Sequence, residues 1–289
     1  MIYLLAASLI WAFSFGLIKG TLTGVDSSFV SCVRMLISFL LFAPFIRLRK
    51  IPRPLMLRLA AAGGVEYGFM YLFYIYSYHF LPAYQVALFT VFTPLYVALI
   101  DDAFEKKFNP EILFTAALAV AGAAIISYHE GSMQAELIGF SVMQISNICF
   151  AFGQIYYRRI LGPRHINELN IFGIVYLGAF VVTAVFAGAM WDRTTLHLTL
   201  QQVLTLLYLG VIASGLAFFL WNYGARRTDS GALAIFNNLK IPLAVGVSML
   251  FFGENTNPIR LTIGGGVVLA ALVINEILIR RRILSSPGL

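Results

Sequence analysis

Three ionisable side chains, those of Arg34, Glu66 and Lys240, lie within long apolar stretches of the chain. A charged group at the centre of a bilayer costs about 2.5–3.5 kcal/mol on insertion scales, so it marks a pathway, an ion pair or a ligand site. Guanidinium and ammonium groups bind carboxylates and other anions, whereas a carboxylate binds an amine or carries a proton. The three residues therefore indicate either a site for a charged small molecule or an ion pair of Glu66 that only fixes helix packing.

Polar and aromatic side chains in the same stretches extend this candidate site. Gln144, Asn147 and Gln154 recur at helical spacing and predict a face that points inward, because lipid would penalise them. A row of tyrosines begins at Tyr67 and Tyr71, and either packing or stacking on a substrate explains such a row. The residues predicted to bind substrate are Trp11, Arg34, Glu66, Tyr67, Tyr71, Thr90, Asn147, Gln154, Asn237, Asn238 and Lys240.

Two prolines, Pro94 and Pro242, lie inside apolar stretches and predict hinges. A proline within a helix removes one backbone hydrogen bond and kinks the helix. The carbonyl groups left without a donor are expected to be those of Thr90 and Asn238, near the middle of the membrane. Either these carbonyls serve the substrate pathway, or a neighbouring helix satisfies them.

The elements that must position these residues are membrane helices. The chain has 289 residues, of which 60% are hydrophobic and 11% are charged, with a mean hydropathy of +0.85, and this excludes a soluble domain with a polar surface. A helix that crosses the bilayer needs about 20 apolar residues. The predicted spans are roughly 2–22, 28–46, 55–77, 80–100, 109–128, 137–157, 168–190, 203–224, 229–252 and 259–279, so the fold class is an all-α integral membrane protein with ten helices.

The basic residues predict the orientation of these spans. Of the 20 Lys and Arg residues, 15 fall in one set of connections, whereas the opposite set holds only Lys19, Arg193 and Arg260. Lysine and arginine collect in cytoplasmic loops, so both termini are predicted to be cytoplasmic. The net charge of +7 is then explained by topology and by anionic membrane lipids, and no nucleic-acid partner is needed.

This orientation gives the depth of the ionisable groups. Glu66 and Lys240 lie about 16 Å from the predicted cytoplasmic end of their helices, and Arg34 lies about 18 Å from it, at 1.5 Å per residue. We expect a polar belt across a central cavity, in which Lys240 meets an anionic group of the substrate and Glu66 lies on the opposing helix.

Two internal matches indicate a duplication. Leu9–Gly20 aligns with Ile148–Arg159, and 89–107 aligns with 236–255, so that Pro94 falls on Pro242. Five helices are an odd number, and the second copy is therefore inserted upside down, as in secondary transporters that bind substrate near the midplane. The two predicted repeats are residues 1–130 and 136–282.

Several segments follow one another in a recognisable order: the W-A-F opening at residue 11, "SFVSCVRMLISFLLFAPF", "YHFLPAYQVALFTVFTPLYVAL", "FFGE" and "GGG". This order resembles the EamA family of the drug/metabolite transporter superfamily, and the resemblance covers nearly the whole chain. It implies a ten-helix bundle around a central cavity, export or exchange of small metabolites such as amino acids, and spans 109–128 and 259–279 set apart from the pathway. We expect a multi-pass protein of a bacterial inner membrane.

The absent motifs narrow the function. The sequence has no nucleotide-binding glycine loop, no metal-ligand spacing and no nucleophile with an evident base, so we expect neither an enzyme nor a cofactor or metal. Transport is then driven by a gradient or by exchange, with protons or a counter-substrate as partners beside the small-molecule substrate and lipids. The predicted substrate is an amino acid or a related zwitterion or carboxylate. The alternatives are an antiporter for phosphorylated or other strongly anionic metabolites and a membrane-embedded transferase acting on lipid-linked substrates.

Overall fold

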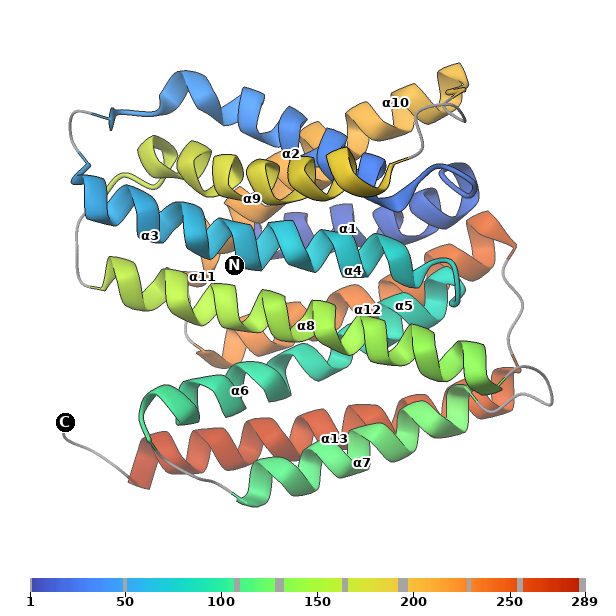
Figure 1. Cartoon of the computed structure of the whole chain (residues 1–289). Coiled ribbons are helices and arrows are strands. Elements are labelled where there is room, and N and C mark those ends of the chain that lie inside the picture. Colours follow the sequence, from blue (N-terminus) through green and yellow to red (C-terminus); the bar gives the residue numbers. More distant parts are fainter. Residues whose placement is uncertain are drawn as a thin grey trace.

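The computed structural model describes residues 2–48, 51–106, 110–127, 133–162, 166–191, 197–227, 230–253 and 257–285, and within these ranges it consists of helices and connecting turns with no strand (Figure 1). This confirms the all-helical fold class. The first half of the chain contains α1 (Ile2–Thr21), α2 (Ser27–Phe42), η1 (Ala43–Phe45), α3 (Arg53–Gly63), η3 (Gly64–Phe69), α4 (Met70–Ser77), α5 (Ala83–Phe89), η4 (Thr90–Phe92), α6 (Thr93–Phe104) and α7 (Pro110–Ser127). The second half contains α8 (Met133–Leu161), α9 (Leu169–Met190), α10 (Leu200–Tyr208), η6 (Leu209–Leu216), α11 (Ala217–Ala225), α12 (Ser230–Phe252) and α13 (Pro258–Ser285).

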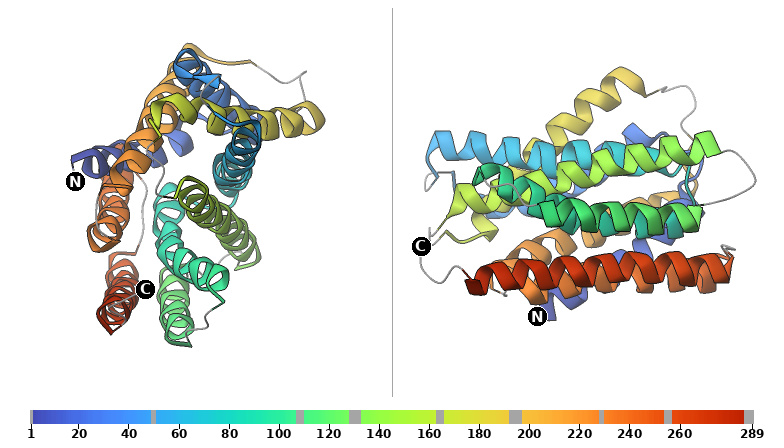
Figure 2. Two further views of the ribbon diagram at one scale, coloured as in Figure 1. Left: turned by 90° about the vertical axis from the view of Figure 1, so that its left-hand side faces the viewer. Right: turned by 90° about the horizontal axis from the view of Figure 1, so that it is seen from below.

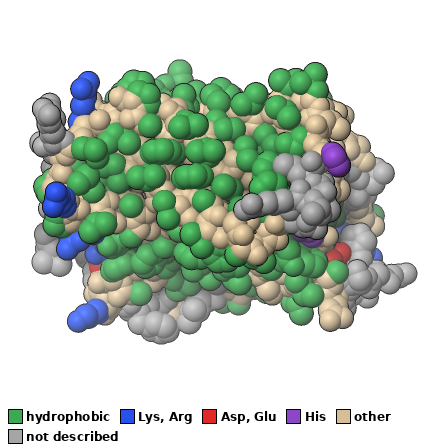
Figure 3. All heavy atoms as spheres, turned by 45° about the horizontal axis from the view of Figure 1, so that its top comes forward, with side chains coloured by type: hydrophobic (Ala, Val, Ile, Leu, Met, Phe, Trp, Pro, Cys, Tyr) green, Lys and Arg blue, Asp and Glu red, His purple; other side chains and the backbone are tan. Residues whose placement is uncertain are grey.

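Within the described residues, six helical stretches are long and apolar enough to cross a membrane, among them Ile2–Thr21 and Leu169–Met190, and two shorter apolar helices lie within α12 and α13. Their outward side chains are apolar: Val185, Leu200 and Leu250 are 65%, 75% and 83% exposed. Figure 3 shows apolar side chains over the middle of one face, with Lys and Arg side chains gathered mainly at its left end. A surface of this kind is stable against lipid and not against water, so the protein spans a membrane.

The helices lie roughly side by side and mix the two halves of the chain (Figure 2). In the packing, α2 and α3 contact α9, α8 lies between α4 and α6, and α1 contacts both α11 and α12. The pair α7 and α13 packs along its length at one edge of the bundle, with few contacts to the other helices (Figure 1). The bundle interior is therefore enclosed by the helices other than this pair.

Side chains cap helices at the connections. The Asp26 carboxylate accepts a hydrogen bond of 2.9 Å from the backbone N–H of Phe29 at the start of α2. At the start of α10, Thr199 and Gln202 form a reciprocal capping box. These bonds satisfy N–H groups that the first helical turn leaves without a partner.

Two helical rods contain a π-helical segment, in which backbone bonds span five residues instead of four. The first, η3, continues α3 into α4, and the second, η6, continues α10 into α11. Segments of this kind are frequent at functional sites. Both segments lie in the bundle interior, where η3 packs on α8 and α9, and η6 packs on α2.

Glycines allow α3 and α9 to approach closely. A Cβ atom on Gly178 would lie 2.7 Å from Ala60 Cα, and one on Gly63 would lie 2.6 Å from the Val175 carbonyl carbon. Backbone atoms cannot yield as a flexible side chain can, so these two positions require glycine. Gly188, on the same helix as Gly178, has no neighbouring atom within 4 Å of its hypothetical Cβ.

We predict that Gly178→Ala destabilises the protein by about 1–3 kcal/mol, because the added methyl group separates α3 from α9. The matched variant Gly188→Ala should leave stability unchanged or raise it slightly, since alanine is the better helix former. Thermal unfolding of the purified proteins in detergent measures both. Equal melting temperatures for the two variants would contradict this description of the contact.

Candidate functional site

A cavity in the bundle interior is bordered by helices from both halves of the chain. Its walls come from α1, α2, α4, η4, α6, α8, α11 and α12. The lining residues are Trp11, Ser14, Phe15, Arg34, Met70, Tyr71, Tyr74, Thr90, Thr93, Met143, Ser146, Asn147, Phe150, Phe218 and Lys240. Among the described residues, the lining contains two cationic side chains and no aspartate or glutamate.

Arg34 is fixed in the cavity wall by three interactions. It is 1% exposed, its Nη2 atom donates a hydrogen bond of 2.8 Å to the Tyr71 hydroxyl, and its Nε atom donates one of 3.1 Å to Ser214 Oγ. The guanidinium carbon also lies 4.2 Å from the centroid of the Tyr71 ring, within the range of a cation–π contact. Nη1 makes no hydrogen bond within the described part of the chain. Arg34 is thus a rigid cation with donor capacity left for an anion.

Lys240 is the second cation of the lining. It projects from α12, is 7% exposed, and its Nζ atom lies 5.3 Å from the centroid of the Trp11 ring. The Trp11 indole is itself held by a hydrogen bond of 2.9 Å from Nε1 to the carbonyl oxygen of Ala213. The ammonium group therefore lies near an aromatic ring whose position is fixed, and this contact lowers the cost of burying its charge.

The carbonyl that fixes Trp11 belongs to η6, whose backbone receives side-chain donors from several helices. Besides Ala213, the carbonyl of Gly210 accepts a bond of 2.8 Å from the Ser38 hydroxyl. The Tyr176 hydroxyl lies 2.7 Å and 2.8 Å from the carbonyl oxygens of Ser214 and Gly215. A π-segment breaks the regular ladder and leaves carbonyls open to such donors. The sequence analysis missed this segment, and the small residues of "GVIASG" are the only signal that could have pointed to it.

Asn147 of α8 donates a hydrogen bond to a backbone carbonyl of the rod formed by α5, η4 and α6. Its Nδ2 atom donates 2.7 Å to the carbonyl of Phe89, and its Oδ1 atom accepts a longer bond of 3.3 Å from Thr93. This carbonyl lies where the rod changes from α-helix to the 3₁₀ turn of η4, shortly before Pro94. The carbonyl that receives a donor from a neighbouring helix is thus that of Phe89. The sequence analysis expected the carbonyl of the next residue, Thr90, to be the one without a helical donor. By contrast, α12 continues as an α-helix through Pro242.

The remaining walls are apolar. Phe15, Phe150 and Phe218 supply aromatic rings, and Met70 and Met143 supply flexible thioethers. Methionine adapts to irregular ligand shapes, and aromatic rings offer large apolar contact area. Together with the two cations, this lining suits an anion attached to an apolar body.

The structure brings together six of the residues that the sequence predicted to bind substrate. Trp11, Arg34, Tyr71, Thr90, Asn147 and Lys240 line the cavity. Glu66, Tyr67 and Gln154 are buried but are not part of the lining. The side chains of Asn237 and Asn238 lie outside the described residues. Sequence reasoning missed the methionines and phenylalanines of the wall, because such residues in a membrane helix do not differ from ordinary packing residues.

Glu66 does not face Lys240 or Arg34, and within the described residues it forms no ion pair with either of them. In a regular helix, Glu66 would share the cavity-facing side of Met70 and Tyr74. The intervening π-segment adds about one residue to a turn, which rotates the preceding side chain by about 100°. The expectation of an opposed Glu66 and Lys240 was based on depth alone, and depth does not fix direction around the helix axis.

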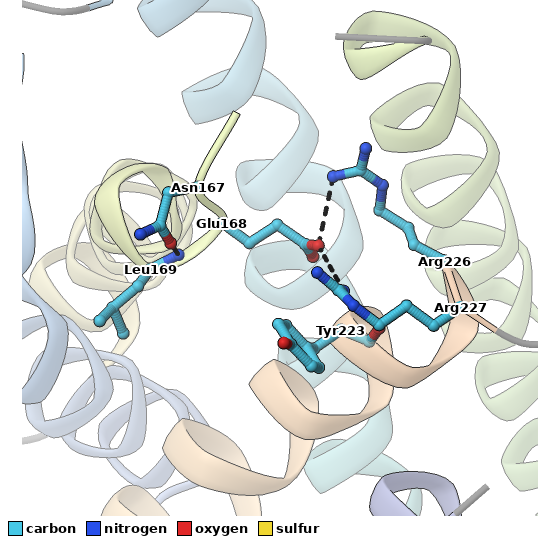
Figure 4. A network of polar contacts seen from close by, with 6 residues as sticks. All are labelled: Asn167, Glu168, Leu169, Tyr223, Arg226 and Arg227. Carbon is cyan, nitrogen blue, oxygen red and sulfur yellow. Dashed lines mark hydrogen bonds and ion pairs between the residues drawn. The ribbon is translucent and has the colours of Figure 1, made fainter. Parts of the chain in front are cut away.

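A charged network joins the start of α9 to the end of α11, at one end of these two helices (Figure 4). Glu168, at the start of α9, is 3% exposed, and its Oε1 atom lies 3.2 Å from Arg226 and 3.0 Å from Arg227, both at the end of α11. The guanidinium of Arg227 also lies 3.4 Å from the centroid of the Tyr223 ring. A second pair joins Arg159 of α8 to Asp101 of α6 at 2.7 Å. The sequence predicted that these basic residues share one side, but it did not predict their acidic partners.

Comparisons with known proteins give a consistent result. The model of the EamA-like transporter family matches residues 1–128 and 137–276. A biotin transporter of Salmonella typhimurium is 35% identical over 278 residues, covering 96% of this chain and 93% of that protein. A probable biotin transporter of Pseudomonas aeruginosa is 36% identical over 280 residues, covering 96% and 98%. A crystal structure with 14% identity superposes with a TM-score of 0.67 over 97% of this chain and 98% of that one, which shows a shared fold.

We predict that Asn147→Leu destabilises the protein by about 1–3 kcal/mol, because it leaves the buried carbonyl of Phe89 without a donor. Ser141→Ala on the same helix is the matched control, since Ser141 is exposed and bonds only to the carbonyl of Leu137 in its own helix. Thermal unfolding in detergent is again the measurement. An Asn147→Leu variant as stable as the Ser141→Ala variant would show that the bond to α5 is dispensable.

Proposed function

Because the chain belongs to the EamA-like transporter family, and is a multi-pass small-molecule transporter of a bacterial inner membrane, we propose that its substrate is a small carboxylate with an apolar body, and specifically biotin. The observation that carries the proposal is a cavity whose described lining has two cations, aromatic and thioether walls, and no acidic residue. The names of the Salmonella and Pseudomonas relatives point to the same molecule.

The chemistry of biotin agrees with this lining. Its carboxylate ends a flexible aliphatic chain, and Arg34 and Lys240 supply the charge-assisted donors that a carboxylate needs. Its sulfur-containing ring suits the phenylalanine and methionine walls. Its ureido group is a planar donor and acceptor, for which Asn147, Thr93 and Ser146 of the lining offer polar atoms.

An amino acid, the substrate expected from the sequence, suits the cavity less well. Its ammonium group needs an acceptor with negative charge, and the residue expected to provide one, Glu66, is not part of the lining. The relatives are not named as amino-acid transporters either. A phosphorylated substrate would meet the same two cations, but the apolar walls would leave much of its polar surface without hydrogen bonds.

We extend the proposal to the topology. Ten spans in two inverted repeats, 1–130 and 136–282, with both termini in the cytoplasm, account for the two separate matches to the family model. They also account for the π-segments, since η3 and η6 each lie in the third predicted span of a repeat. The ion-paired arginines at one end of the bundle then lie at the cytoplasmic surface.

We predict that Lys240→Met lowers the affinity for biotin by about 10- to 100-fold, the expected loss for one hydrogen bond to a charged group. The affinity for biotinamide, which lacks the carboxylate, should change far less. The neutral Met keeps most of the side-chain volume, so the melting temperature should stay close to that of the wild type. Binding of radiolabelled ligand to the purified protein in nanodiscs measures both affinities.

Lys19→Met is the matched control, because Lys19 lies outside the cavity and donates to the carbonyl of Tyr78. It should bind biotin as the wild type does. A wild-type protein that binds biotin and biotinamide equally, or a Lys240→Met variant with unchanged preference for the carboxylate, would overturn the proposed role of the cations. Absence of biotin binding by the wild type would overturn the substrate itself.

A further inference from the structure

Glu66 is a buried ionisable group of the interior that does not belong to the described lining of the cavity. Its side chain is 1% exposed and projects from η3. Within the described residues, neither carboxyl oxygen makes a hydrogen bond, and no lysine or arginine forms an ion pair with it. A buried carboxyl group without a partner is rare in a folded protein and calls for a functional explanation.

The packing around Glu66 makes room for this side chain and holds it in place. On α8, Gly153 faces it so closely that a Cβ atom there would lie 2.6 Å from Glu66 Cα and 2.8 Å from Glu66 Cγ. On the other side, η3 packs against α9, where a Cβ on Gly68 would lie 2.9 Å from Val182 Cβ. The carboxyl group can therefore reach water only if these helices move relative to one another.

The groups that face Glu66 are hydroxyls and an amide. Tyr67 and Asn222 lie beside it, although neither forms a hydrogen bond with good geometry to it, and the Asn222 amide instead donates 2.7 Å to the Tyr67 hydroxyl. Tyr157 of α8 and Tyr176 of α9 complete the surroundings. Arg34 of α2, one of the two cations of the cavity lining, is held instead by Tyr71 and Ser214. These neighbours supply no positive charge to balance an ionised carboxylate.

Tyr157 of α8 lies near Glu66 and also near Glu168, which belongs to the charged network drawn in Figure 4. Its hydroxyl is fully buried, makes no hydrogen bond among the described residues, and interacts electrostatically with both Glu66 and Glu168. The Oε2 atom of Glu168 likewise has no hydrogen-bond partner there, while its Oε1 atom meets Arg226 and Arg227. Tyr157 is thus a described group that lies near both carboxyl groups.

The free energies of burial decide what Glu66 can do. An ionised carboxylate in this enclosure would cost several kcal/mol, because no cation pairs with it and the neighbouring Tyr67 hydroxyl and Asn222 amide replace little of its lost hydration. A protonated carboxyl group avoids that cost. The arrangement of helices in this structure and the binding of a proton to Glu66 therefore stabilise each other, and such mutual stabilisation is the thermodynamic basis of coupling.

We propose that Glu66 is the proton-binding site of this transporter, separate from the substrate cavity and reached from the end of the bundle at which Glu168 lies. The inference rests on the proposed function, because it assigns the driving ion of the same transport. An O–H bond forms on the Glu66 carboxylate in the enclosed arrangement and breaks when helix movement exposes the group to water. The substrate carboxylate stays ionised on Arg34 and Lys240, so one anion and one proton cross together and the net charge moved is zero.

Transport by the full-length protein in proteoliposomes tests this assignment. With the membrane potential clamped by valinomycin and potassium, an imposed pH gradient should drive accumulation of radiolabelled biotin by the wild type. Glu66→Gln keeps the shape of the side chain and cannot exchange the proton. It should lose accumulation driven by the pH gradient by about tenfold or more, while biotin/biotin exchange without a gradient stays within about twofold of the wild type.

Glu105→Gln is the matched control, because that carboxylate lies at the end of α6 with 43% of its side chain exposed. It should retain both exchange and accumulation driven by the pH gradient. Tyr157→Phe removes only the tyrosine hydroxyl. It should slow the pH change inside the vesicles that accompanies biotin transport, measured with an enclosed pH-sensitive dye, more than it slows biotin/biotin exchange.

The outcomes separate this inference from the proposed function. No biotin exchange by the wild type would refute the substrate. Exchange by the wild type without a response to the pH gradient would refute proton coupling alone. A Glu66→Gln variant that keeps gradient-driven accumulation, or that folds but loses exchange as well, would refute the role of Glu66. If Glu66→Gln does not fold, Glu66→Asp decides, because a changed carboxyl position must shift the pH at which accumulation is half-maximal, and an unshifted value would refute the assignment.

Discussion

A polar group inside a bilayer has no water to bind, and the architecture of this protein depends on that constraint. Where a helix departs from regular geometry, another helix supplies the missing partner. The carbonyls of η6 receive donors from Trp11, Ser38 and Tyr176, and the carbonyl of Phe89 receives the Asn147 amide. Each such bond joins elements that are distant in sequence, so the irregular segments hold the bundle together.

The same bonds organise the cavity. Trp11 lies beside Lys240 because its indole is tied to η6, and Arg34 lies in the wall because Ser214 of η6 and Tyr71 of α4 hold its guanidinium. Both cations are therefore positioned before any ligand arrives. A site that is already organised spends less of the interaction energy on ordering its own side chains. This organisation suits the capture of a carboxylate from water.

Charge is divided between two places in the interior. The cations line the cavity, whereas the Glu66 carboxyl lies outside the described lining, near Tyr67, Tyr157 and Tyr176, on a residue that packs against Gly153 of α8. If the groups met, they would neutralise each other and leave neither for a ligand. Their separation lets an anion and a proton bind at different positions while the same helix movements act on both, because η3 carries Glu66 and continues directly into the cavity-lining α4.

The sequence by itself determined the membrane class, the helical fold, the family and the approximate helix positions, because apolar length, helical period and the order of small motifs are properties of the chain alone. It also identified Arg34 and Lys240 as cavity residues, since charges in apolar stretches are costly anywhere in a bilayer. Only the tertiary structure decided the direction of Glu66, the partners of Arg34 and the acidic partners of the terminal arginines. A regular helical period fixes depth and face only while the period holds, and the π-segment at Gly64–Phe69 breaks it.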